Sequence, residues 1–222
     1  MSIAKNLQQI KSEIPQGVTL IAVSKTKPVE DILEIYNQGH QIFGENKVQE
    51  LSEKHEKLPK DIQWHLIGHL QSNKVKYIAG FVHLIHSIDS LKLLKEVNKE
   101  AIKHNRIIDC LIQLHIAQEE TKFGFSFDEA LELLSGKALE PLHNIRITGV
   151  MGMASFTDNK NKIHIEFKSL ADFFNRINKN CSENSNVKLN ILSMGMSGDY
   201  KIAIEEGSNM VRVGSAIFGN RH

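Results

Sequence analysis

Short apolar segments rich in β-branched residues alternate along the chain with longer segments in which apolar residues recur every three or four positions. The first pattern is typical of buried strands and the second of amphipathic helices. The candidate strands are Val18–Ser24, Gln41–Gly44, Ile62–Ile67, His83–Ile88, Ile107–His115, Ile145–Met151, Lys188–Leu192 and Met210–Val213. The candidate helices between them are Pro28–Gln38, Val48–Leu58, Ser72–Ala79, Ser90–Lys103, Phe127–Leu134, Lys162–Asn178 and Gly198–Glu206.

This alternation predicts a parallel sheet whose helices make right-handed crossovers between neighbouring strands. Eight strands within 222 residues favour an α/β fold of the (β/α)8 TIM-barrel type, with residues 1–222 as a single domain. The spacing alone does not exclude an open doubly wound sheet. Ahead of the first strand, Ile3, Leu7, Ile10 and Ile14 form one apolar stripe, so residues 1–14 are expected to form a helix packed on the barrel.

Composition and charge limit the functional classes. Hydrophobic residues make up 41% and charged residues 24% of the chain, as in ordinary soluble proteins. A formal net charge of +1 provides no strong field for nucleic acid or an anionic membrane. No segment has the character of a signal peptide or membrane span. Because the two cysteines, Cys110 and Cys181, lack a redox or zinc spacing, we expect a cytoplasmic protein.

Lys25 stands at the end of the first candidate strand. Side chains alternate along a strand, so Lys25 shares a face with Ile21 and Val23. In a parallel barrel the active face lies at this end of the strands, and an amine desolvated there can attack a carbonyl. The alternative is a solvated lysine, which is what we expect of Lys27. Asn46, after the second strand, could either face the barrel mouth or cap the next helix.

The loops after the last two strands suggest a phosphate site. Barrels often bind phosphate there, through backbone N–H groups and a helix N-terminus. Ser197 lies in the first of these loops, and Gly214 and Ser215 lie in the second. Glycine permits close backbone approach and serine supplies a hydroxyl, although such loops can also be simple turns.

Arg212 lies inside the apolar strand Met210–Val213. A buried arginine needs a partner. That partner could be an acid on a neighbouring strand, in a structural ion pair, or an anion or ring nitrogen of a ligand. The closely spaced histidines favour hydrogen-bonded interior or mouth positions over a metal site, since no cysteine accompanies them and no HExxH pattern occurs. These histidines are His65, His69, His83 and His86.

Five sequence blocks, in order along nearly the whole chain, resemble the YggS/PROSC family of pyridoxal 5′-phosphate (PLP) homeostasis proteins. They are Ala22–Pro28 (AVSKTKP), Phe43–Glu50 (FGENKVQE), Trp64–Gly68 (WHLIG) with Gln71–Lys74 (QSNK), Leu192–Ser197 (LSMGMS) and Val211–Gly219 (VRVGSAIFG).

The resemblance implies the type III PLP fold, a barrel like the N-terminal domain of alanine racemase. It implies that Lys25 binds PLP as a Schiff base. The implied neighbours of the cofactor are Ser197, Gly214 and Ser215 at the phosphate, Arg212 at the pyridine nitrogen, and Asn46 nearby. Lys47, His69 and His115 replace residues usual in the family, all expected at the rim.

Three functions compete. A cation at the pyridine nitrogen disfavours ring protonation and so weakens PLP as an electron sink. Arg212 therefore favours a PLP carrier acting in vitamin B6 homeostasis, without turnover of its own, that could supply PLP-dependent acceptor enzymes. Without a second domain to form a dimer, we expect it to be a monomer. An amino-acid racemase is the alternative, but racemases of this fold carry a second β-domain, and the chain ends at His222. A lysine aldolase for a phosphorylated sugar would explain Lys25 and the phosphate loops but not Arg212.

Overall fold

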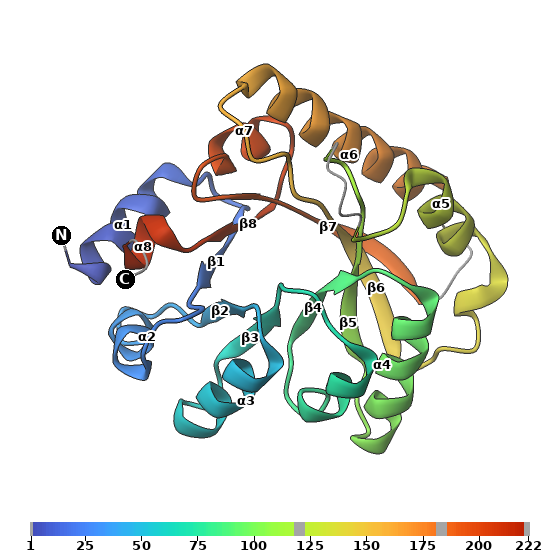
Figure 1. The fold of residues 1–222 in the computed structure, drawn as a ribbon, viewed down its shortest axis with the longest axis horizontal. Helices are drawn as coiled ribbons and strands as arrows, with labels where there is room; N and C mark the ends of the chain where they lie inside the picture. The colour runs from blue at the N-terminus through green and yellow to red at the C-terminus, as the bar shows by residue number, and fades with distance from the viewer. Residues whose placement is uncertain (1, 118–122, 181–185, 220–222) are drawn as a thin grey trace.

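The computed structural model describes residues 2–117, 123–180 and 186–219, and eight parallel strands in these ranges close into a barrel in sequence order, as Figure 1 shows. Closure follows from the parallel pairing of β1 with both β2 and β8. The eight expected strands and the barrel are confirmed, and the open sheet is excluded. The strands are β1 (Thr19–Val23), β2 (Ile42–Glu45), β3 (Gln63–Leu66), β4 (Leu84–Ile88), β5 (Ile108–Gln113), β6 (Ile145–Met151), β7 (Val187–Met196) and β8 (Met210–Val213).

Helices surround the barrel (Figure 1). The expected N-terminal helix is present, with Leu7 and Ile10 buried, and it lies beside α2 and α8. The helices are α1 (Ile3–Glu13), α2 (Val29–Tyr36), α3 (Val48–Lys57), α4 (Leu91–Lys103), α5 (Phe127–Ser135), α6 (Lys160–Asn180), α7 (Tyr200–Glu205) and α8 (Ser215–Phe218), with the short 3₁₀ helices η1 (Ser72–Tyr77) and η2 (Lys137–Leu139). None of the helices in the described ranges is long and apolar enough to cross a bilayer.

Two elements near the last two strands differ from the expectation. Strand β7 runs to Met196, four residues beyond the expected end at Leu192, because Ser193 pairs with Met210 and Met196 pairs with Arg212. Ser193 and Gly195, which lie beyond the expected end, are therefore part of the strand, whereas Ser197 follows it. The short helix α8 was not expected, and it places the backbone of Ser215 at its first turn.

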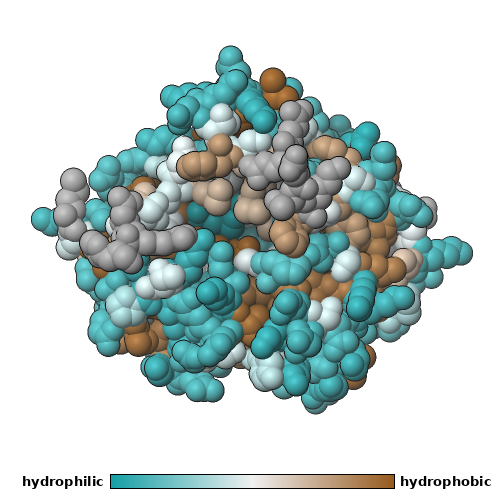
Figure 2. Space-filling view, in the orientation of Figure 1, coloured by the Kyte–Doolittle hydropathy of each residue, from teal (hydrophilic) through white to brown (hydrophobic). Residues whose placement is uncertain are grey.

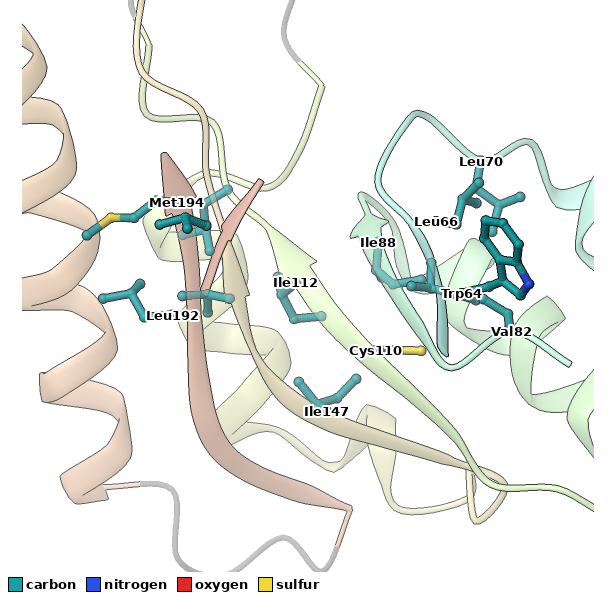
Figure 3. Packing of buried hydrophobic residues seen from close by; sticks show 14 of the residues in the cluster. Trp64, Leu66, Leu70, Val82, Ile88, Cys110, Ile112, Ile147, Leu192 and Met194 are labelled. Carbon is teal, nitrogen blue, oxygen red and sulfur yellow. The ribbon is translucent and has the colours of Figure 1, made fainter. Parts of the chain in front are cut away.

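The apolar core has two parts. The larger part fills the space between the strands and the outer helices, and Figure 3 shows Trp64 against Leu66, Leu70 and Val82 within it. A smaller cluster lies inside the barrel and consists of Ile21, Val23, Leu84, Leu111, Met151 and Met210. Cys110 is buried in the larger part, as expected, whereas Cys181 lies outside the described residues. Figure 2 shows that polar side chains cover much of the outer surface, with apolar patches between them.

Candidate functional site

A pocket of about 390 Å³ opens at the carboxyl ends of the strands. Its volume is within the range of small-molecule sites, about 300–1,000 Å³. The structure brings all six residues singled out from the sequence into its wall: Lys25, Asn46, Ser197, Arg212, Gly214 and Ser215. These residues come from loops or strand ends at β1, β2, β7 and β8, which closure of the barrel makes neighbours.

Lys25 lies two residues after the end of β1, and side chains of helix α3 hold the backbone on both sides of it. The carbonyl of Ser24 accepts a hydrogen bond from Lys54 Nζ at 2.8 Å. The N–H of Thr26 donates to Glu50 Oε1 at 2.6 Å, and Thr26 has a φ of 65°. A positive φ is uncommon for a non-glycine residue, so the contact with Glu50 supports this conformation. The lysine is thus presented from a rigid segment.

Lys54 belongs to a buried ionic cluster behind Lys25. Its ammonium lies 2.8 Å from Glu45 Oε1 and 2.7 Å from Glu50 Oε1. Ser24 Oγ also donates to Glu45 Oε1, at 2.6 Å. Burial raises the pKa of the Glu45 carboxyl, and the charge of Lys54 opposes that rise. Sequence reasoning missed this cluster. The spacing of Glu50 and Lys54, one helical turn apart, was its only visible signal.

Lys27 does not match the expectation of an exposed side chain. It is half-buried, lines the same pocket as Lys25 and donates from Nζ to the carbonyl of Phe218 at 3.0 Å. The expectation failed because α8, which carries Phe218, could not be foreseen from the sequence. The pocket therefore holds two lysines.

Asn46 lines the pocket, and the residue at the start of α3 is Lys47, which makes no side-chain cap. Asn46 is therefore not the N-cap of α3, which was the alternative role expected for it. Its backbone passes very close to Gly68, where an added Cβ would lie 2.3 Å from the Asn46 carbonyl oxygen. Only glycine at position 68 lets the chain after β3 approach the pocket wall this closely.

Ser197 connects the loops that follow β7 and β8. Its Oγ accepts hydrogen bonds from the backbone N–H groups of Gly214, at 3.1 Å, and Ala216, at 3.4 Å. The neighbouring Asp199 accepts the N–H of Met196 at 2.5 Å, and burial raises the pKa of its carboxyl. The loops thus bring backbone N–H groups, here bonded to Ser197 Oγ, and a hydroxyl to one wall of the pocket, and groups of this kind bind anions in other proteins.

Arg212 is buried, with 3% of its surface exposed, and reaches the pocket from β8. Its Nη1 donates to Ser193 Oγ at 2.6 Å and its Nη2 to the carbonyl of Gly152 at 3.1 Å. Burial lowers the pKa of the guanidinium to about 10, so it remains charged at neutral pH. Within residues 2–117, 123–180 and 186–219 no acid forms an ion pair with it, so the structural ion pair considered from the sequence is not observed there.

The departures from the family pattern lie near the rim, as expected. His69 pairs with Asp89 at 3.1 Å, and its ring centroid is 4.8 Å from that of Phe123. Lys47 is exposed, and the backbone of His115 pairs with Phe125. None of these three residues is among those that line the pocket with Lys25.

His40 provides a test of acid sensitivity. Burial lowers its pKa from 6.5 to about 4, so the unfolded chain takes up the proton first as the pH falls. Its contribution to stability is complete above about pH 6.5 and is lost towards about pH 4. We expect His40→Gln to reduce the loss of unfolding free energy between about pH 7 and about pH 5 by roughly 2 kcal/mol. Urea unfolding at both pH values measures this difference, and an equal loss in the two proteins would contradict it.

Comparison with known proteins agrees with this geometry. The chain matches the family model for the alanine racemase N-terminal domain over residues 1–222. An alanine racemase from Clostridium difficile superposes with a TM-score of 0.78 at 15% identity, covering 99% of this chain and 57% of that one, which shows the shared fold. Fold and pocket together define a barrel of the alanine racemase N-terminal class.

More similar relatives narrow the class. A pyridoxal phosphate homeostasis protein from Aquifex aeolicus is 42% identical over 91% of this chain and 86% of its own. The structure of PipY from Synechococcus elongatus with PLP bound has a TM-score of 0.86 at 33% identity, covering 98% of this chain and 100% of that one. The chain belongs to the family of pyridoxal phosphate homeostasis proteins.

Proposed function

We propose that this protein binds PLP through Lys25 and acts in PLP homeostasis, with residues 1–222 as one PLP-binding domain. The observation that carries the proposal is Arg212, a buried cation that forms no ion pair with a described acid, in the same pocket as Lys25; Asp199 acts on it only through its charge. A buried cation that is not directly paired is costly, so this part of the pocket favours a ligand group that can pair with it. PLP offers an anionic phosphate, a ring nitrogen for Arg212 and an aldehyde for the lysine.

Each wall of the pocket has a role in this proposal. Ser197, Gly214 and Ser215 would hold the phosphate through the N–H groups and hydroxyls of the two loops, and Asn46 would lie near the cofactor. Lys25 would hold the cofactor through its amine, which can bond to the aldehyde carbon with release of one water. The names of the relatives and the PLP-bound PipY structure support this assignment.

We further propose that the protein has no turnover of its own. A guanidinium at the pyridine nitrogen disfavours ring protonation and limits the stabilisation of carbanions by the ring. This favours retention of PLP, with transfer to PLP-dependent acceptor enzymes, over racemisation. In this proposal the protein is a cytoplasmic monomer. Incubation with single enantiomers of several amino acids, followed by chiral chromatography, tests it: accumulation of the opposite enantiomer would support a racemase instead.

The first experiment is the visible absorption spectrum of the purified protein with and without added PLP. Borohydride reduction and peptide mass mapping then locate the adduct. A yellow protein with the adduct on Lys25 supports the proposal. A colourless protein that ignores PLP would overturn it and favour a barrel acting on a phosphorylated sugar.

Arg212→Leu is expected to weaken PLP binding about 10- to 100-fold and to change the spectrum of bound PLP, because hydrogen bonds to charged groups contribute about 1.5–3 kcal/mol. The free energy of unfolding without PLP should stay level or rise, since the variant removes a buried unpaired charge. Titration with PLP and urea unfolding measure the two effects. Arg146→Leu, on β6 and paired with Asp109, is the control. An unchanged spectrum would place Arg212 outside the cofactor contacts.

A further inference from the structure

A chain of polar side chains crosses the barrel interior behind Arg212. Arg212 Nη1 donates to Ser193 Oγ at 2.6 Å, and Ser193 Oγ lies 3.1 Å from His86 Nδ1. His86 Nε2 lies 3.0 Å from His65 Nδ1. The four side chains come from β8, β7, β4 and β3, so the chain joins opposite sides of the barrel, and each is 3% exposed or less.

The two histidines in this chain are neutral. Burial lowers the pKa of His65 to about 3 and that of His86 well below its ordinary value, and the charge of Arg212 adds to the effect on His86. Each ring therefore carries one proton, on one of its two nitrogens. Two arrangements of these protons satisfy the contacts, and they leave different groups without a partner.

In the first arrangement the Ser193 hydroxyl donates to His86 Nδ1, and His86 Nε2 donates to His65 Nδ1. The proton of His65 is then on Nε2, a buried atom that has no partner among the described residues. In the reverse arrangement His65 Nε2 remains without a donor, and the Ser193 proton also has no acceptor among the described contacts of that hydroxyl. Since every unpaired buried polar group is unfavourable, the first arrangement is preferred.

The charge of Arg212 favours the same arrangement. In this arrangement the dipoles of the three side chains all have their negative ends towards the guanidinium. These ends are the oxygen of Ser193, the acceptor nitrogen of His86 and the acceptor nitrogen of His65. Oriented dipoles in a low-dielectric interior stabilise a nearby charge without a counter-ion. Asp199 is the acid whose charge acts on Arg212, and it forms no described ion pair with it.

We propose that Ser193, His86 and His65 are positioning residues for Arg212. As an oriented chain with both histidines in the Nε2–H tautomer, they stabilise its buried charge and hold its guanidinium towards the pocket. The tautomers and the direction of the chain follow from the contacts among these side chains together with the neutral state of the two rings, and they do not depend on PLP. The consequence for PLP binding rests on the proposed function.

Nitrogen NMR of the histidine rings in the full-length protein without PLP tests the tautomers. His40 serves as an internal reference, because its Nε2 donates to the carbonyl of Ile42 at 2.9 Å and so carries the proton. We expect His65 and His86 to show the same tautomer as His40 near neutral pH. A proton on Nδ1 of His86, or a charged ring, would overturn the proposed chain whether or not the protein binds PLP.

A double-mutant cycle tests the link to Arg212. His86→Phe is expected to weaken PLP binding about tenfold and to change the spectrum of bound PLP, whereas the same change at His40, a buried histidine that does not line the pocket, should change neither. In the Arg212→Leu background His86→Phe should have less than about a twofold further effect. An equal weakening in both backgrounds would show that His86 acts independently of Arg212. Should His86→Phe fail to fold, Ser193→Ala tests the same coupling, because Arg212 Nη1 then loses its acceptor.

Discussion

Replacing Lys25 by alanine is expected to abolish covalent retention of PLP while leaving the fold intact. The reason is chemical: the side chain supplies the amine that bonds to the aldehyde, and among the described residues that line the pocket only Lys27 also has an amine. Lys25 is partly exposed at the end of β1, so the free energy of unfolding should change by less than about 1 kcal/mol. Borohydride reduction followed by peptide mapping should give no labelled peptide.

Lys27→Ala is the matched control for this experiment, since both lysines line the pocket. The amine of Lys27 is held by the carbonyl of Phe218, so its removal should leave the adduct on Lys25 in place. An adduct on Lys27 in the wild-type protein, or a Lys25→Ala protein that still forms a reducible adduct, would show that Lys25 is not the attachment site.

The strands could be predicted because their signal is local. A run of β-branched residues with a helix after it indicates a crossover unit wherever it occurs, and eight such units leave few folds other than a barrel. The end of β7 could not be predicted, since Ser193 and Gly195 have loop-forming character and become part of the strand only by pairing with β8. Helix α8 was missed for a different reason, because a helix of four residues is too short to show a helical period.

The pocket residues could be predicted from their place at strand ends, but the groups that support them could not. Arg212 was conspicuous as a charge in an apolar strand. Its partner Ser193, by contrast, is 19 positions away and resembled a loop residue. Lys54 is one of several lysines and glutamates along α3, and only the tertiary structure shows that it alone of these lysines is buried. The contacts that hold the pocket residues in place join residues far apart in the sequence, whereas sequence patterns show only how residues close together in the chain are arranged.

Lys54→Met is expected to destabilise the fold by about 3–5 kcal/mol, the range for removing one partner of a buried ion pair. Glu45 is fully buried, and its Oε2 has no partner among the described residues, so the variant would leave a buried carboxylate without its cation. Urea unfolding near neutral pH measures the loss. Lys57→Met, an exposed lysine on the same helix, is the control and should change stability by less than about 0.5 kcal/mol.

The pH dependence of this loss identifies its cause. Without Lys54 the pKa of Glu45 in the folded protein lies further above its unfolded value, because burial and the charge of Glu50 raise it and only the hydrogen bond from Ser24 still lowers it. A raised folded pKa means that stability is recovered as the pH falls through that value, so the gap to the wild type should narrow in mild acid. Glu45→Gln combined with Lys54→Met should recover much of the loss near neutral pH, since no unpaired charge remains. Two results together would assign the effect to lost packing around the lysine stem. They are a difference in unfolding free energy between wild type and Lys54→Met that is constant with pH, and a double variant no more stable than Lys54→Met.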